Sequence, residues 1–267
     1  MTGERAPVPR TKAREHAMRN TSGEMRKRVP LAASAVPARA RPLSPLWRER
    51  PGQPSMGITT LSAETLAVAV AELGTRDRDL AAVVERFGPP PLWGRDSGFG
   101  TLVQIILEQQ VSLASARAAY ERLTSTAGAM TPERVVTVDD AAMRGAGVSR
   151  QKASYIRSLA RAIVEGAFDP EALDALDDDA ARAELIKLKG IGAWSADIYL
   201  LMALRRADVW PSGDLALVGA LREVKRLRAL PDAARIERLT RPWRPWRAVA
   251  ARVLWHHYLS TPRRRAR

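Results

Sequence analysis

The chain has 267 residues, with no cysteine and three histidines. Without cysteine it has no disulfide, no cysteine nucleophile and no cysteine-ligated zinc or iron–sulfur site. Three histidines (His16, His256 and His257) are too few to predict a multi-histidine metal site. The sequence has no run of about 18 apolar residues, so no transmembrane helix is predicted. The basic N-terminus has no apolar segment typical of a secretory signal. These absences favour an intracellular protein that does not act in a membrane.

Positive charge is what the sequence has in excess. Lysine and arginine total 43 against 29 acidic residues, a net charge of +14. This excess suggests a polyanionic partner, with nucleic acid fitting better than an anionic membrane surface. Residues 1–55 alone hold 12 Lys/Arg, 4 Glu and 8 of the 18 prolines, without apolar periodicity. We interpret 1–55 as a disordered basic arm. The alternative is a solvated tail, or a translation start assigned too far upstream of Met56.

Residues 56–267 have a different pattern. From Leu61 onward, apolar residues recur at spacings of three and four, and strand-like alternation is scarce. About a dozen short helices are expected, the first of them closed by Gly74. The predicted fold class is all-α.

A glycine-flanked hairpin is the most informative segment. A helix is expected to end near Leu188, and a second begins at Ala193. Gly190 and Gly192 between them allow a sharp turn with positive φ, and Ile191 can plug the space between the two helices.

The start of the second helix is a candidate anion site. Its free amides and the positive end of the helix dipole suit a DNA phosphate, and Lys187 and Lys189 add charge nearby. The alternative is an ordinary helix–helix corner with glycine caps.

An aspartate follows the hairpin at a fixed distance. Asp214 comes 22 residues after Gly192 and follows a Pro-Ser-Gly break, where a helix would begin. Free amides at that position should hold the pKa of its carboxyl low. The pattern fits a catalytic carboxylate and an ordinary N-cap equally well.

Several segments together resemble the helix-hairpin-helix, Gly/Pro…Asp superfamily of DNA glycosylases, in its 3-methyladenine DNA glycosylase II branch. Two segments carry the main resemblance: Leu188-Lys189-Gly190-Ile191-Gly192-Ala193-Trp194 and Pro211-Ser212-Gly213-Asp214. Three more agree with it: Ile105-Ile106-Leu107-Glu108-Gln109-Gln110-Val111-Ser112, Gly147-Val148-Ser149-Arg150-Gln151-Lys152-Ala153 and Trp243-Arg244-Pro245-Trp246-Arg247. The resemblance runs from about Leu80 to Leu259.

The resemblance implies a two-lobed helical fold with the active-site cleft between the lobes. One lobe would span about 98–210, and the other about 56–97 plus 211–260. The branch's extra N-terminal β domain has no counterpart before Met56, so a compact form is expected.

The resemblance also implies an enzyme that hydrolyses the N-glycosidic bond of alkylated purines, of the 3-methyladenine and 7-methylguanine class, in duplex DNA. Asp214 is the expected catalytic carboxylate, and Gln110 the wedge that fills the gap left by the flipped base. Trp194 stands where bifunctional relatives carry a lysine nucleophile, which predicts no strand-cleaving lyase activity. The expected base-pocket residues are Trp194, Ile198, Trp246 and Gln109. Ile198 departs from the aromatic residue that is frequent in the branch, and Asp197 is expected to be a structural hydrogen-bond partner.

Cofactors and partners follow from the same resemblance. No cofactor is required and no iron–sulfur cluster is expected, whereas a structural monovalent cation at the carbonyls of Leu188 and Gly190 would match many relatives. The expected partner is double-stranded DNA with a damaged base, bound by a monomer in a bacterial-type cytoplasm or another intracellular DNA compartment. Two alternatives stay open: a glycosylase for deaminated or etheno bases, and a non-catalytic helix-hairpin-helix DNA-binding protein.

Overall fold

The computed structural model describes residues 60–262. The predicted basic arm 1–55 lies outside the described residues. Within 60–262 the chain is helical, and its only β-type pairing is an isolated bridge between Thr60 and Arg206. The all-α prediction is therefore confirmed. None of the helices in this range is long and apolar enough to cross a membrane.

The described helices follow one another through short loops. In chain order they are α1 (Ala63–Arg76), α2 (Arg78–Phe87), α3 (Phe99–Glu108), α4 (Leu113–Ala127), α5 (Pro132–Val136), α6 (Asp140–Gly145), α7 (Arg150–Val164), the 3₁₀ turn η1 (Glu171–Ala175), α8 (Asp178–Lys187), α9 (Ala193–Met202), α10 (Leu215–Val224), α11 (Ala233–Thr240), the 3₁₀ turn η2 (Arg241–Trp243) and α12 (Arg247–Ser260).

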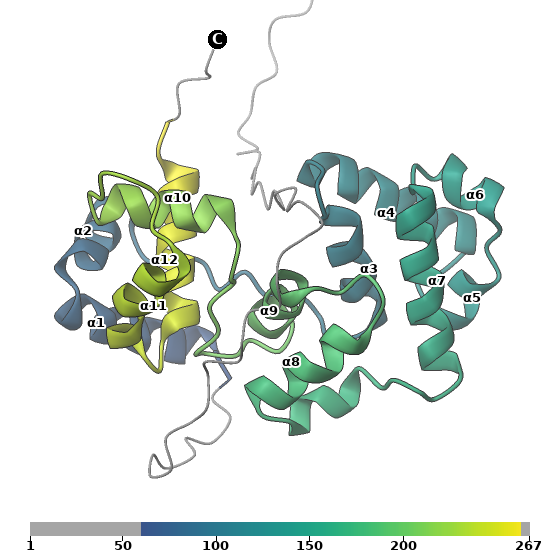
Figure 1. Cartoon of the computed structure of the whole chain (residues 1–267), viewed down its shortest axis with the longest axis horizontal. Coiled ribbons are helices and arrows are strands. Elements are labelled where there is room, and N and C mark those ends of the chain that lie inside the picture. The colour runs from purple at the N-terminus through teal and green to yellow at the C-terminus, as the bar shows by residue number, and fades with distance from the viewer. Residues whose placement is uncertain (1–59, 263–267) are drawn as a thin grey trace, which may run out of the picture.

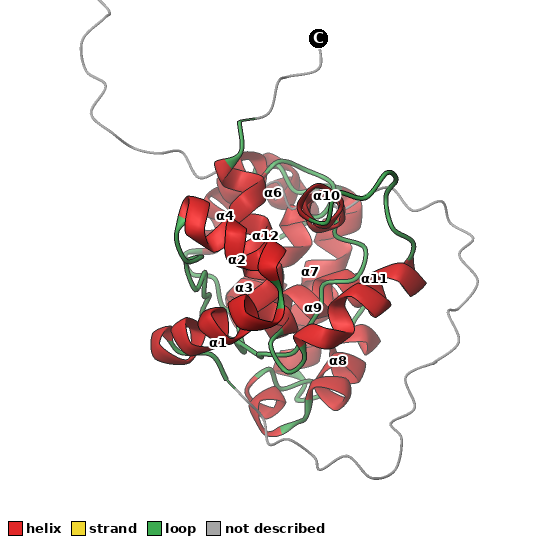
Figure 2. Ribbon diagram, turned by 90° about the vertical axis from the view of Figure 1, so that its left-hand side faces the viewer, coloured by secondary structure: helices red, strands yellow, loops and turns green. Residues whose placement is uncertain are grey.

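The helices gather in two lobes (Figure 1). One lobe combines the two ends of the described chain, because α12 packs against α1, α2 and α10. The other contains α3 to α8, where α3 packs against α4 and α7. Helix α9 lies between the lobes and packs against α3 and α8. Figure 2 looks onto the first lobe, with α9 and α8 behind it.

Helices α9 and α12 are buried on almost every side and contain few charged residues. In α9, every residue from Ser195 to Met202 is buried, and in α12 the same holds from Ala248 to Trp255. A helix with apolar residues all round belongs in a core. The buried charge of α12 is Arg252, whose guanidinium donates to the carbonyls of Leu92 and Leu201, each at 2.7 Å. This buried cation ties α12 to α9 and to the segment that joins the lobes.

The end of the first helix differs from the prediction. Helix α1 continues through Gly74 to Arg76, and the chain turns at Asp77. The Asp77 carboxylate accepts the amides of Asp79 and Leu80 as the N-cap of α2, and it also accepts a 2.7 Å hydrogen bond from the Trp243 indole. A glycine inside a helix costs only about 1 kcal/mol. Capping and packing at Asp77 outweigh that cost, so the cap decides where α1 ends.

Candidate active site and nucleic-acid interface

The hairpin between α8 and α9 has the predicted form. Helix α8 ends at Lys187, Ile191 is buried, and α9 starts at Ala193. Gly190 has a φ of +90°, and a Cβ there would lie 2.3 Å from ring atoms of Tyr155. The predicted positive φ is wrong for Gly192, which has a φ of −96° as the N-cap of α9. A Cβ at Gly192 would meet no atom within 4 Å, so the surface at the start of α9 is open at this position.

The two hairpin lysines have different environments. Lys187 is exposed and forms a 2.6 Å ion pair with Glu184 one turn earlier in α8. Lys189 is exposed and its ammonium makes a 3.3 Å hydrogen bond to the Ser154 hydroxyl of α7. Among residues 60–262, Lys189 therefore has no carboxylate partner to displace before it binds a phosphate, whereas Lys187 has one.

Gln109 fastens the end of α3 to the hairpin. Its side-chain nitrogen donates to the carbonyl oxygen of Gly190 at 2.8 Å and to the Ser195 hydroxyl at 3.1 Å. The next residue, Gln110, is exposed and has a φ of +58°. Left-handed backbone is uncommon outside glycine, and at functional sites it is held by the surrounding structure. The structure thus brings the expected wedge residue next to the expected phosphate-binding turn.

The two carbonyls predicted to bind a monovalent cation already accept hydrogen bonds. The Gly190 carbonyl accepts the Gln109 amide, and the Leu188 carbonyl accepts the amide of Ile191 at 3.0 Å. Each oxygen keeps one lone pair for a further interaction. No group of three or more acidic or histidine side chains in residues 60–262 is arranged to hold a metal ion. A monovalent cation at Leu188 and Gly190 stays a prediction.

Asp214 lies where α10 begins, and its side chain is the N-cap. One carboxylate oxygen accepts the Leu217 amide at 2.7 Å and the Trp255 indole N–H at 3.5 Å. The other accepts the indole N–H of Trp194 at 3.3 Å. The residue is 2% exposed. Trp194, one of the expected pocket residues, is therefore in direct contact with the expected catalytic carboxylate.

The pKa of Asp214 is shifted opposite to the prediction. Burial raises the pKa of the carboxyl above its ordinary value, and the hydrogen bonds from Leu217, Trp194 and Trp255 only partly oppose this. The sequence indicated the helix amides that lower the pKa but not the desolvation that raises it. Asp214 is thus a buried carboxylate that three N–H donors hold in place.

The other expected pocket residues lie elsewhere. Trp246 donates its indole N–H to Glu72 of α1 at 2.6 Å. It precedes Trp255 by nine residues, which is about 13 Å along the axis of α12. The structure therefore does not join Trp246 to Asp214, and Trp255 has the position beside the carboxylate. Ile198 is fully buried within α9. Nothing in the local sequence distinguishes Trp255 from a core tryptophan, because its partner comes from a helix far away in the chain.

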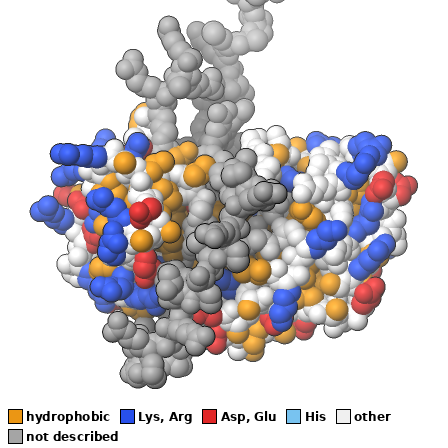
Figure 3. Space-filling view, viewed as in Figure 1, with side chains coloured by type: hydrophobic (Ala, Val, Ile, Leu, Met, Phe, Trp, Pro, Cys, Tyr) orange, Lys and Arg blue, Asp and Glu red, His pale blue; other side chains and the backbone are white. Residues whose placement is uncertain are grey.

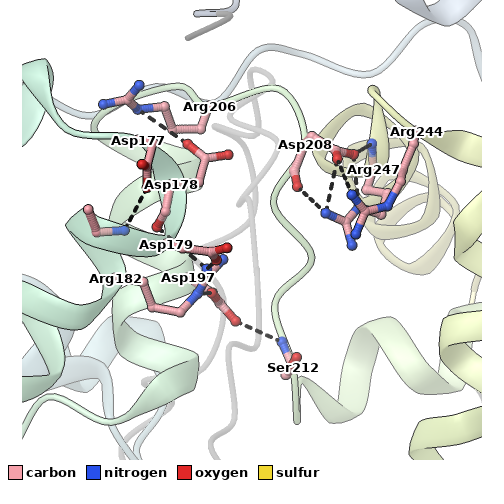
Figure 4. Close-up of polar contacts among 11 residues, drawn as sticks. Asp177, Asp178, Asp179, Arg182, Asp197, Arg206, Asp208, Ser212, Arg244 and Arg247 are labelled. Atoms are coloured by element: carbon pink, nitrogen blue, oxygen red, sulfur yellow. Dashed lines mark hydrogen bonds and ion pairs between the residues drawn. The ribbon is translucent and has the colours of Figure 1, made fainter. Parts of the chain in front are cut away.

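The loop that leads to Asp214 is anchored at two points (Figure 4). The Asp197 carboxylate of α9 accepts the Ser212 amide at 3.2 Å and the Arg182 guanidinium of α8 at 2.7 Å. The carboxylate of Asp208, at the start of the loop, accepts two hydrogen bonds from the Arg247 guanidinium of α12, at 2.8 and 2.9 Å. The prediction that Asp197 is a structural hydrogen-bond partner is confirmed. Both lobes therefore hold the segment that carries Asp214.

Replacing Asp197 by Ala is expected to lower the free energy of unfolding by about 2 kcal/mol, because the Ser212 amide and the Arg182 guanidinium lose a buried acceptor. Asp179 is the matched control: it also pairs with Arg182, at 2.6 Å, but its side chain is 76% exposed. Asp179→Ala should cost less than about 0.5 kcal/mol. Urea unfolding of both variants at neutral pH measures the difference, and equal losses would show that Asp197 is not an anchor.

Two hollows border the hairpin on the described surface. One, of about 340 Å³, lies between the α3 turn, α7 and the hairpin. The other, of about 610 Å³, follows α7, and its basic residues are Arg150, Arg157, Arg161 and Lys189. Figure 3 shows lysine and arginine side chains spread over both lobes of one face, with fewer acidic ones between them. The surface around the hairpin is polar and basic, which suits a polyanion.

Two helical lobes, a glycine hairpin with free helix amides, and a buried carboxylate at the next helix start together define a helix-hairpin-helix protein. The chain matches the family described as HhH-GPD superfamily base excision DNA repair protein over residues 103–245. This match covers more than half of the chain, which therefore belongs to that superfamily.

Known proteins similar to the chain point to one branch of the superfamily. DNA-3-methyladenine glycosylase 1 of Schizosaccharomyces pombe is 27% identical over 180 residues, covering 66% of this chain and 79% of that protein. A solved structure of the S. pombe 3-methyladenine DNA glycosylase in complex with abasic DNA has a TM-score of 0.62 and 26% identity, covering 72% of this chain and 95% of that one. A 3-methyladenine glycosidase structure from Bacillus halodurans has a TM-score of 0.62 and 28% identity, with 77% and 94% coverage. The resemblance inferred from the sequence motifs is confirmed.

Proposed function

We propose that this protein is a monofunctional DNA glycosylase that removes alkylated purines from duplex DNA and so initiates base excision repair. The observation that carries the proposal is the contact between Trp194 and Asp214. Asp214 is the only buried carboxylate among the N-caps of the described helices, and this contact places it beside Trp194, in the first turn of α9 after the hairpin. The relatives named as 3-methyladenine glycosylases support the same substrate class.

The chemistry follows from the leaving group. Alkylation at N3 or N7 makes a purine cationic, so the base departs without strong general-acid help. As the N-glycosidic bond breaks, its electron pair goes to the base, and positive charge develops on the sugar. The Asp214 carboxylate stabilises that charge electrostatically and orients the water that adds to C1′. The water proton passes to solvent. The Trp194 indole, which already contacts Asp214, offers an aromatic face to the cationic base.

The absence of lyase chemistry follows from Trp194. An indole has no amine that could form a Schiff base with the sugar. Strand breaks are therefore expected only after alkali treatment of the abasic product, and borohydride should trap no covalent protein–DNA adduct.

The assay that tests the proposal uses single-turnover conditions and a duplex with one 7-methylguanine or 3-methyladenine-type lesion. Released base and strand breaks are measured separately. Base release without strand breaks is the expected result. Release only from duplexes with deaminated or etheno bases would assign the alternative specificity, and tight binding without release from any duplex in the panel would indicate a non-catalytic DNA-binding protein.

The hairpin lysines should contribute unequally to DNA binding. Lys189→Gln is expected to reduce the slope of log affinity against log salt by about 1, as for the loss of one phosphate contact. Lys187→Gln should reduce it less, because Lys187 is paired with Glu184. Arg238→Gln on α11 in the other lobe is the charge-matched control. Fluorescence anisotropy on an undamaged duplex between 50 and 200 mM salt, the range over which phosphate contacts change affinity most, gives the slopes. Identical slopes for Lys189→Gln and the control would contradict the assignment.

Cofactor use, assembly and location form the remaining part of the proposal. Water, Asp214 and the cationic leaving group suffice for the reaction, so no cofactor is required, and a monovalent cation at the hairpin would have a structural role only. Action as a monomer is part of the same proposal. The substrate places the enzyme wherever the cell keeps its DNA, the cytoplasm in a bacterium.

A further inference from the structure

The turn after α3 holds a strained residue in an exposed position. Helix α3 ends at Glu108, and the chain passes through Gln109 and Gln110 before α4 starts at Leu113. Gln110 has a φ of +58° and is exposed. A non-glycine residue in left-handed backbone costs roughly 1–3 kcal/mol and persists only where the neighbouring structure enforces it. Contacts made by the residues next to Gln110 must therefore hold the turn.

Lys152 of α7 supplies the contact from one side. Its ammonium donates to the carbonyl oxygens of Leu107, at 2.7 Å, and of Gln109, at 2.8 Å. Leu107 lies in the last turn of α3, where carbonyls have no partner within the helix and the helix dipole favours a cation. Burial lowers the pKa of Lys152, as expected for an ammonium partly removed from water. One lysine thus links the end of α3 to the residue directly before Gln110.

The hairpin supplies the contact from the other side, through the side chain of Gln109 on Gly190 and Ser195. The turn is therefore held between α7 and the hairpin. The 340 Å³ hollow opens over this junction, and Gln110, Lys152 and Gly190 all line it. Of these three residues, Lys152 alone is charged, and its ammonium lies where the α3 turn, α7 and the hairpin come together.

We propose that Lys152 is a positioning residue for base extrusion: it locks the α3 turn so that Gln110 is presented to the DNA before binding. The inference rests on the proposed glycosylase function and assigns no chemistry to Lys152. A wedge that is ordered in advance loses no ordering entropy when it enters the base stack. Without the ammonium, two carbonyls lose their donor and Gln110 can relax to ordinary backbone angles.

The test compares two duplexes that differ only in the cost of extrusion. In one the alkylated purine faces its normal partner, and in the other it faces an abasic-site analogue, where unpairing is already complete. Lys152→Met should slow single-turnover release about 30-fold on the paired duplex, within the range seen for small displacements of a functional group. On the unpaired duplex the rate should fall by less than about 3-fold, because extrusion there breaks no base pair and depends less on the wedge residue. Lys152→Arg, which keeps the charge and the donors, should recover most of the rate on the paired duplex.

A double-mutant cycle separates positioning from a general structural role. Gln110→Ala should show the same preference for the unpaired duplex, and Lys152→Met combined with Gln110→Ala should be no slower than the slower single variant. Fluorescence of 2-aminopurine beside the lesion reports unstacking independently of chemistry, and it should fall in both single variants. If Lys152→Met does not fold, Lys152→Gln, which keeps one donor group, replaces it.

The outcomes are distinguishable. Equal slowing on the two duplexes, additive effects of Lys152 and Gln110, or unchanged 2-aminopurine fluorescence would overturn the positioning role. Failure of the wild-type protein to release base from either duplex would overturn the proposed function. The unstacking signal would still decide the role of Lys152 in that case.

Discussion

Asp214→Asn is expected to slow base release by about 10³-fold in a single-turnover assay, while binding to the lesion duplex stays within about 2-fold of wild type. The variant keeps an oxygen for the Leu217 amide but lacks the negative charge that, in the proposed mechanism, stabilises the sugar cation. Because the substitution preserves the cap, the helix start should remain intact. Excision at the wild-type rate would show that the active site lies elsewhere.

Asp232 is the matched control for this substitution. It is the N-cap of α11 and accepts the Arg235 amide at 2.7 Å, the same local contact that Asp214 makes with Leu217 at 2.7 Å. Asp232 is exposed and far along the chain from the hairpin. Asp232→Asn should leave base release unchanged. A loss of activity in both variants would mean that capping, and not charge at the site, limits the reaction.

The raised pKa of Asp214 sets the sign of two pH effects. In the proposed mechanism base release requires the ionised carboxylate, so the rate should fall as the pH drops through a pKa above the ordinary value, and Asp214→Asn should not show this fall. For folding, a carboxyl whose pKa is raised in the native state stabilises the protein below its unfolded pKa. This contribution is lost as the pH rises through the native pKa. Asp214→Asn lacks this titration, so its unfolding temperature relative to wild type should rise between acid pH and pH 7, whereas the lost acceptor for the Trp194 N–H lowers it at every pH.

Gly190→Ala is expected to lower the free energy of unfolding by about 3 kcal/mol. An alanine at a φ of +90° carries a backbone penalty of about 1–2 kcal/mol. Its Cβ would also lie 2.3 Å from the Tyr155 ring, and overpacking of this kind costs about 1–3 kcal/mol. Thermal and urea unfolding measure the loss.

Gly192→Ala is the control within the same hairpin. Its φ of −96° suits any residue, and the added Cβ meets no atom within 4 Å. It should cost less than about 1 kcal/mol, the difference between glycine and alanine at an N-cap. It should nevertheless weaken DNA binding, because the methyl group would stand beside the α9 amides that we propose bind a phosphate. Equal destabilisation at the two glycines would contradict the different roles that the structure assigns to them.

The sequence by itself determined the local features of this protein. Apolar residues at spacings of three and four predict helices, and glycines on both sides of Ile191 predict the hairpin. The Pro-Ser-Gly break before Asp214 indicates a helix start. These features depend on neighbouring residues only, so one sequence contains the necessary information. The order of the motifs then identifies the superfamily.

The tertiary structure alone decided what surrounds these residues. Asp214 is buried against tryptophans from α9 and α12, so desolvation, and not its helix amides, sets the direction of its pKa shift. Trp255 rather than Trp246 contacts the carboxylate, and Lys152 reaches the end of a helix that lies 45 residues earlier. Such contacts depend on which helix faces pack together across the lobes. Local spacing specifies a face of a helix, but the partner of that face comes from a distant part of the chain, and only the folded structure specifies it.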